Sequence, residues 1–240
     1  MGSIQRASAK LRGMGKGFIE GLRLVYVSAN ALTVQAGSAY VPSLNKAVEL
    51  GTDKALTGLS LTAATFYHFY LYENAGVGDI EMSTTAPVRV SGSAFQKTGD
   101  SSRRYIGSAL AGASNTLQKF IHYPSTGQMY YLVANAGVAP FIVLAGGTTT
   151  TTYDIDPAAA IPVTAHTACT SVSAGSAAVV FGNVDQVNAL AGPNWLSSVS
   201  ASVIAKLDIP IGSNGRFQAK NTATSTGGVT VYILGYFFER

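Results

Sequence analysis

Alternating apolar and polar residues, in short runs separated by turn residues, make up most of this 240-residue chain. Successive side chains of a β-strand point to opposite faces, so alternation with a period of two indicates strands with one buried face. Such runs cover 22–27, 128–133 and 203–211, and longer apolar runs cover 177–184 and 229–238. Turn signals recur about every 8–12 residues, which is typical of a β-sandwich. The pattern predicts an all-β fold with a β-sandwich or jelly-roll body.

The strand with the most aromatic residues is predicted at Phe66–Tyr72, where His68 interrupts a run of aromatic and apolar residues. Bulky residues fall on both faces of this strand, so we expect it to lie between two layers, or between a core and a subunit interface. The aromatic residues predicted to pack there are Phe66, Tyr67, Phe69, Tyr70 and Tyr72.

Turn residues at 73–79 predict a reversal into a short strand at 80–83. A long polar loop is expected to follow, before a third strand at 103–108. Two further hairpins are predicted, each around a Gly-containing turn. They join 31–35 to 39–42, and 217–221 to 229–238. Additional strands are expected at 44–50, 56–61, 114–122 and 141–144, the last of them buried, with a short helix as the alternative for 45–50.

Three segments of this region together resemble a module of bacteriophage tail-fibre and other virion structural proteins. They are YHFYLY (67–72), STTAP (83–87) and RRYIGS (103–108). The family pattern has RRIGS in the last segment, so Tyr105 is an additional residue in this chain, and the turn after Glu73 is short. The resemblance implies a virion structural protein without catalytic residues. It also implies a homo-oligomer, most often a trimer in fibre families.

Charge is sparse and unevenly distributed. Only 12% of the residues are charged, and the net charge is +4. The whole excess lies in residues 1–23, since the rest of the chain is balanced, which argues against a broad nucleic-acid-binding surface. Residues 1–20 are therefore predicted to form an extended basic arm. The arm is a solvated tail, a segment that docks into an acidic groove of a partner protein, or a segment that contacts nucleic acid. The candidate docking residues of this arm are Arg6, Lys10, Arg12 and Lys16.

Residues 21–240 are predicted to form the β-sandwich, with 146–157 as the place where two packed subdomains would meet. No apolar run approaches the roughly 20 residues that a membrane-spanning helix needs. The N-terminus lacks the apolar region of a secretory signal, and the single cysteine, Cys169, suits a reducing cytoplasm.

Candidate chemistry is limited, and we predict neither a catalytic residue nor a cofactor nor a metal site. His68, His122 and His166 lie too far apart in sequence for a local metal-binding pair, and His68 is interpreted as a core or interface histidine bonded to the backbone. Cys169 has neutral and apolar neighbours, which indicates a buried structural thiol. Asp154 and Asp156 would share one face of a strand without the further oxygen ligands that Ca²⁺ requires.

The sequence therefore predicts a non-enzymatic virion protein, made in the host bacterial cytoplasm, that takes part in host attachment as a tail-fibre or tail-associated component. An alternative is a head fibre or decoration protein on the capsid. A second alternative is a carbohydrate-binding β-sandwich, in which Asn194 and Trp195 form a loop that contacts a host surface glycan; the competing interpretation of Trp195 is a plug at one end of the sandwich. The expected partners are other copies of the chain and other virion proteins.

Overall fold

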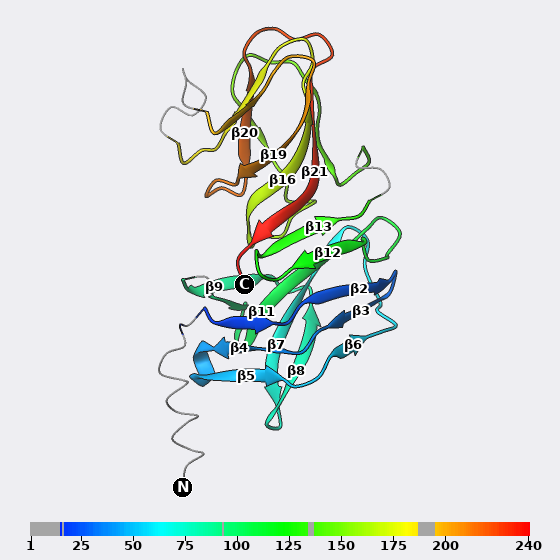
Figure 1. Cartoon of the computed structure of the whole chain (residues 1–240), viewed down its shortest axis with the longest axis vertical. Coiled ribbons are helices and arrows are strands. Elements are labelled where there is room, and N and C mark those ends of the chain that lie inside the picture. The colour runs from blue at the N-terminus through cyan, green and yellow to red at the C-terminus, as the bar shows by residue number, and fades with distance from the viewer. Residues whose placement is uncertain (1–14, 16, 93, 134–136, 187–194) are drawn as a thin grey trace. The chain divides into compact units, whose positions relative to one another are not determined.

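The computed structural model describes residues 15, 17–92, 94–133, 137–186 and 195–240. Within them the fold is all-β, with antiparallel strands (Figure 1) and one 3-10 turn, η1, at Pro42–Leu44 as the single helical element. The predicted fold class is confirmed. None of the described residues belongs to a helix that is long and apolar enough to cross a membrane.

The chain divides into two compact units. The first unit contains the residues up to Gly127 together with Glu239 and Arg240, and the second unit contains Gln128–Phe238. The chain therefore enters the second unit upstream of the segment 146–157, the place predicted from the sequence for a break between subdomains.

The first unit has three antiparallel sheets. Their strand orders are β1-β4-β5, β8-β7-β11-β10-β9 and β12-β2-β3-β6. The strands are β1 (Ile19–Gly21), β2 (Leu24–Ser28), β3 (Ala31–Val34), β4 (Gly37–Val41), β5 (Lys46–Leu50), β6 (Lys54–Leu56), β7 (Thr65–Asn74), β8 (Val77–Ser83), β9 (Pro87–Ser91), β10 (Ala94–Lys97), β11 (Asp100–Ala111) and β12 (Phe120–Tyr123).

A long bent hairpin supplies strands to two of these sheets. Strands β1 and β2 pair in one continuous register with β4 and β3, and the chain reverses after Ser28. The predicted turn at 36–38 is therefore wrong, because this segment is the bend between β3 and β4. Gly21 and Leu22 have φ of 65° and 53°, which turns the chain from one sheet into the next. Opposite them, a Cβ on Gly37 would lie 2.3 Å from the Glu20 carbonyl oxygen, so only glycine fits.

Other predictions for the first unit need correction as well. The polar loop predicted after residue 83 contains two strands, β9 and β10, whose alternation was missed. The strand predicted at 114–122 is shorter, and only Phe120–Tyr123 forms β12. Before it, the amide of Leu117 donates to the carbonyl of Ala29, and the amide of Gln118 donates to that of Leu110 in β11. The turn predicted at 73–79 narrows to Ala75 and Gly76, both with positive φ, because β7 and β8 pair as far as Asn74 and Val77.

The second unit is a sandwich of two sheets. One sheet has the order β19-β16-β21-β13, with β14 pairing along the same strand β21, and the other has the order β15-β20-β17-β18. The strands are β13 (Gln128–Tyr131), β14 (Ile142–Gly147), β15 (Tyr153–Ile155), β16 (Ala165–Ser173), β17 (Val179–Gly182), β18 (Ser197–Val199), β19 (Ile204–Pro210), β20 (Phe217–Asn221) and β21 (Val229–Phe238).

Two predictions for the second unit are wrong. Strands β20 and β21 do not form a hairpin, because the connection 222–228 crosses from one sheet to the other, and Thr226 bonds to Ser176 on the way. The strand predicted as buried at 141–144 is β14, which is partly exposed, while Phe141 just before it is buried.

We predict that Gly78→Ala destabilises the first unit by about 1–3 kcal/mol, because the added methyl group overpacks a close contact between two strands. A Cβ on Gly78 in β8 would lie 2.1 Å from the carbonyl oxygen of Glu49 in β5. Urea unfolding followed by circular dichroism measures the change. Gly51→Ala is the matched control, since a Cβ there meets nothing within 4 Å. Equal unfolding midpoints for the two variants would contradict the prediction.

Candidate functional site

The candidate site is the pair of strands β7 and β11, which carry two of the three segments that resemble the virion module. Ser108 lies opposite His68 and Tyr105 lies opposite Tyr70, with a register shift between Tyr105 and Gly107. This shift is a β-bulge, in which two residues of one strand oppose one residue of the other. Tyr105 and Ser108 would face opposite sides of a regular strand, but the bulge brings both to the face of His68.

A buried chain of hydrogen bonds results from this bulge. The hydroxyl of Ser108 lies 2.7 Å from Nδ1 of His68 and 2.8 Å from the hydroxyl of Tyr105. All three residues are buried, and burial lowers the pKa of His68 to about 4. His68 is thus a neutral core histidine that bonds to a side chain, not to the backbone as the sequence analysis expected.

The third segment of the module is bonded to the same strand pair. Tyr70 donates a hydrogen bond of 2.6 Å to the carbonyl oxygen of Thr85, and burial raises the pKa of the Tyr70 hydroxyl well above its ordinary range. The next residue, Ala86, accepts bonds from the backbone and the hydroxyl of Thr98. The segments 67–72, 83–87 and 103–108 therefore form one hydrogen-bonded unit.

Arg104 lies in β11 with its side chain fully buried. It donates hydrogen bonds to the carbonyl oxygen of Phe95 at 3.0 Å and to that of Gly17 at 3.4 Å. Burial, together with the positive charge of Arg240, lowers the pKa of Arg104 to about 10. Because Gly17 lies two residues before the start of β1, Arg104 connects the strand RRYIGS to the position where the basic arm joins the body.

A second buried arginine, Arg240, binds the bend of the long hairpin. Its guanidinium donates to the carbonyl oxygens of Gly21 at 3.1 Å and Pro124 at 3.0 Å. At the bend, the carbonyl groups of the chain lose the neighbouring strand that would donate hydrogen bonds to them, and a buried carbonyl without a donor is costly. The guanidinium of Arg240 acts as the donor for the carbonyl of Gly21.

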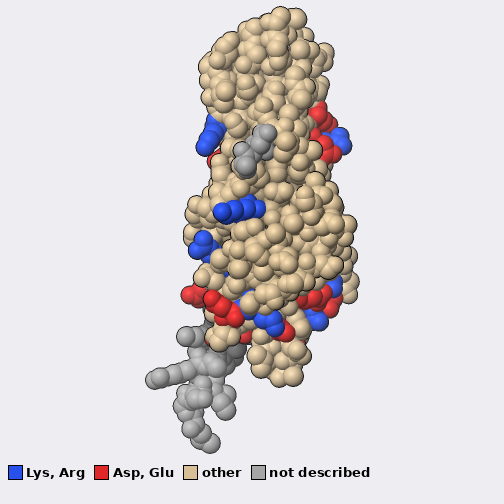
Figure 2. Space-filling model, turned by 90° about the vertical axis from the view of Figure 1, so that its right-hand side faces the viewer, with Lys and Arg blue, Asp and Glu red and all other residues tan. Residues whose placement is uncertain are grey.

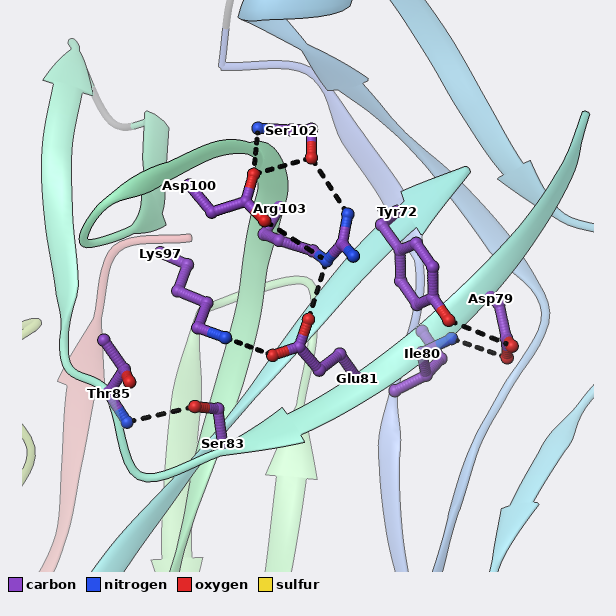
Figure 3. A network of polar contacts seen from close by, with 10 residues as sticks. All are labelled: Tyr72, Asp79, Ile80, Glu81, Ser83, Thr85, Lys97, Asp100, Ser102 and Arg103. Atoms are coloured by element: carbon purple, nitrogen blue, oxygen red, sulfur yellow. Dashed lines mark hydrogen bonds and ion pairs between the residues drawn. The ribbon is translucent and has the colours of Figure 1, made fainter. Parts of the chain in front are cut away.

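A network of charged side chains occupies the exposed end of the same strands (Figure 3). The guanidinium of Arg103 lies 3.9 Å from the ring centroid of Tyr72 and 2.6 Å from a carboxylate oxygen of Glu81. Lys97 binds the other oxygen of Glu81, and Asp100 accepts two hydrogen bonds from Ser102. Burial acts to raise the pKa of Glu81, but the hydrogen bonds and charges of Lys97 and Arg103 outweigh it and lower that pKa.

Two shallow hollows of about 260 Å³ and 520 Å³ lie along β5 and the β7–β8 turn. Both lysines that line them are held in ion pairs, Lys54 with Asp79 at 2.8 Å and Lys46 with Glu73. We assign no ligand to these hollows.

The remaining candidates from the sequence are dispersed. Arg6, Lys10, Arg12, Lys16 and Asn194 lie outside the described residues. Trp195 is 42% exposed, which does not fit a plug at the end of the sandwich. The predicted packing residues of β7 are confirmed as buried for Tyr67, Phe69 and Tyr70 and are partly exposed for Phe66 and Tyr72.

Residues with potential chemistry are held in structural contacts. Cys169 is buried, and burial raises its pKa to about 12. Nδ1 of His122 accepts a hydrogen bond of 3.0 Å from the Leu24 amide, and burial together with Arg240 and Arg23 lowers its pKa to about 3. Asp154 and Asp156 lie beside Arg216, at 3.9 Å and 3.0 Å. Across the described ranges, no three His, Cys, Asp or Glu side chains gather as they would around a metal ion.

The chain matches no protein-family model, and no curated protein matches its sequence.

The structural roles of Ser108, Arg104 and Arg240 were not predicted from the sequence. The one available signal was the additional Tyr105, because an inserted residue in a strand indicates a bulge.

We predict that the first unit loses stability as the pH falls from 7 to 5. The pKa values of His68 and His122 lie at about 4 and about 3 in the folded protein, below their ordinary value of 6.5. The unfolded chain therefore takes up protons first, so the contribution is complete above pH 6.5 and declines toward the folded pKa values. Each histidine contributes up to about 1.4 kcal/mol per pH unit.

Urea unfolding at pH 7, 6 and 5, with hydrogen exchange of first-unit peptides, measures this slope. The double variant His68→Gln, His122→Gln should flatten it. Gly78→Ala, which lowers stability but keeps both histidines, should retain it. A slope unchanged in the double variant would refute the assignment.

Proposed function

We propose that this protein is a non-enzymatic structural protein of a bacteriophage particle, specifically a tail-fibre or tail-associated component. It attaches to the particle through its basic N-terminal arm and contributes to host attachment. The observation that carries this proposal is the hydrogen-bonded unit formed by the three segments that resemble the virion module. Arg104 of the same module binds the carbonyl of Gly17, where the arm joins the body.

The mechanism is recognition by shape and charge. The arm carries four basic residues within its first 16 positions, and it binds an acidic groove on a neighbouring virion protein. A rigid attachment point favours such binding, because less of the binding free energy is spent on ordering the chain. Arg104 and the pairing of β1 with β4 provide that rigid point on the body.

The body acts as a homo-oligomer, for which the family resemblance implies a trimer. A low charge content supports this part of the proposal, since the centres of subunit interfaces are depleted of charged residues. The second unit has few charged residues, and Figure 2 shows broad uncharged areas on the face in view. The charged residues of the second unit are Asp154, Asp156, Asp185, Lys206, Asp208, Arg216 and Lys220.

The same properties suit a head fibre or decoration protein on the capsid. Antibody labelling of purified particles distinguishes the two positions, since label on the tail supports host attachment and label on the capsid supports decoration. Absence of label from every particle would overturn the virion role.

We predict that a variant without residues 1–14 loses incorporation into particles while its body stays folded. The deletion removes three of the four basic candidates and leaves Gly15 and Gly17, so the bond from Arg104 is retained. Particle-bound protein is quantified by immunoblot, and folding is verified by circular dichroism. Replacement of the basic residues of the arm by Gln is the matched control for charge, and it should reduce incorporation as well. Normal incorporation of the deletion variant would rule out docking through the arm.

The exposed Trp195 supports a second candidate function, binding of a host surface glycan. An exposed tryptophan offers an aromatic face for stacking on a sugar ring. We predict that any signal on a glycan array falls about two- to tenfold in Trp195→Ala, because aromatic stacking is worth about 0.5–1.5 kcal/mol. Tyr123→Ala, at a residue of similar exposure (44%) in the first unit, is the control. Equal signals from both variants would exclude Trp195 from glycan binding.

A further inference from the structure

Strand β19 forms one edge of its sheet in the second unit (Figure 1). All seven of its residues pair with β16, from Ile204 opposite Ser173 to Pro210 opposite Thr167. In the part of the chain that the structure describes, no strand pairs with its other side. A strand edge of this length can accept a further strand through its backbone.

The hydrogen bonds to β16 establish which backbone groups of β19 point outward. The amide of Ile211 donates to the carbonyl of His166 at 2.9 Å, and the amide of Ala174 donates to the carbonyl of Val203 at 3.0 Å. The odd-numbered residues of β19 therefore direct their N–H and C=O groups toward β16. Since these directions alternate along an antiparallel strand, the even-numbered residues direct theirs to the open edge. Pro210, which has no N–H, is also even-numbered, as expected for an edge position.

The side chains of the even-numbered residues share one exposed face. Ile204 is 74% exposed, and Lys206 and Asp208 are exposed as well. The Asp208 carboxylate lies next to the thiol of Cys169, the residue opposite it in β16. Neither Lys206 nor Asp208 has an ion-pair partner among the residues that the structure places. Two opposite charges thus stand two residues apart on an open edge.

We propose that β19 pairs with β19 of a second copy of this chain, antiparallel and about a two-fold axis at Leu207. In this register Lys206 of each copy faces Asp208 of the other copy. Both residues point their backbone groups outward, so each Lys206–Asp208 pair can exchange two backbone hydrogen bonds while the side chains form an ion pair. The exposed Ile204 of one copy then faces Pro210 of the other.

The charges select this register over its neighbours. A residue whose backbone groups point to the open edge must lie opposite another such residue. The two-fold axis must therefore pass through a residue position, and the nearest alternative registers have the axis at Lys206 or at Asp208. An axis at Lys206 would place two lysines opposite each other, and an axis at Asp208 would place two aspartates opposite each other. Like charges directly opposite are destabilising. The axis at Leu207 alone pairs opposite charges at both positions.

A contrasting role for the same residues is protection of the edge. Lysine and proline on an edge strand commonly prevent unwanted pairing. The two roles predict opposite effects of removing the charge. If Lys206 protects the edge, Lys206→Thr increases association, whereas if Lys206 pairs with Asp208 of a second copy, the same substitution weakens it.

The proposed contact does not rest on a virion role, and it can be tested on the isolated full-length protein. A two-fold contact of this kind produces dimers, and in a trimeric body it would join one trimer to another. Self-association is measured by sedimentation velocity over protein concentrations of about 1 µM to 1 mM at low salt.

Charge reversal is the first test. Lys206→Asp and Asp208→Lys should each weaken self-association about tenfold or more, because two attractive pairs become repulsive. The double variant Lys206→Asp, Asp208→Lys should restore it, and a mixture of the two single variants should associate as well. Lys220→Asp, a reversal on β20 away from this edge, is the matched control. Thermal unfolding verifies that every variant is folded.

A cysteine placed on the axis tests the register. Leu207 and its copy would form a non-hydrogen-bonded pair with Cα atoms about 4.5 Å apart, which suits a disulfide. Leu207→Cys should therefore form a disulfide-linked dimer under oxidising conditions. Ala205→Cys should not, because its two copies would lie about 13 Å apart along the strands. The native Cys169 is buried, and wild-type protein controls for it.

Loss and recovery of association in the charge variants, together with the Leu207→Cys disulfide, would establish the contact. Wild-type protein that does not self-associate, stronger association of Lys206→Thr, or equal cross-linking of both cysteine variants would overturn it. None of these outcomes depends on particle incorporation, so failure of this contact and failure of the virion role remain distinguishable.

Discussion

The bulge in β11 is the constraint on which the first unit depends. A strand presents every second residue to one face, and Tyr105 and Ser108 are separated by three positions. The extra residue at the bulge brings both to the face of His68, where the three polar groups bond to each other in the middle of the five-stranded sheet. Without the bulge, the hydroxyl of Tyr105 would leave this face, and a buried polar group would lose its partner. The cost of such a loss is about 1–3 kcal/mol, a large fraction of the stability of a domain.

The two buried arginines solve a related problem for the backbone. Sheets satisfy their own N–H and C=O groups, but a hairpin that bends from one sheet into another leaves some of these groups without a neighbouring strand. Arg240 binds carbonyls at the bend, and Arg104 binds those of Phe95 and Gly17. Guanidinium groups suit this task because they offer several donors in a fixed plane and keep their charge when buried. The last residue of the chain is thereby bound to the strand that follows the arm.

The sparse charges of this protein serve mainly to connect its strands. Glu81 binds residues of β10 and β11, Asp79 binds Lys54, and Arg216 lies beside Asp154 and Asp156. Charge pairs at partly exposed positions add little stability individually, but they specify which strands lie side by side. Lys206 and Asp208 have no such partners within the described chain, and they lie two residues apart on the open edge of β19. In the proposed contact they pair with each other between two copies.

The sequence by itself determined the fold class, the position of most strands and the aromatic core of β7. These features follow from side-chain periodicity and turn residues, which are local properties of the chain. It also placed the excess positive charge in the first 23 residues, since charge is read directly from composition. Only the tertiary structure decided which strands pair. The hairpins predicted at 36–38 and at 222–228 were wrong because each of these segments passes from one sheet into another. The partners of His68, Arg104 and Arg240 were likewise decided in three dimensions. The bonds from His68 to Ser108, from Arg104 to Gly17 and from Arg240 to Gly21 join residues 40 to 219 positions apart, a range over which local patterns carry no information.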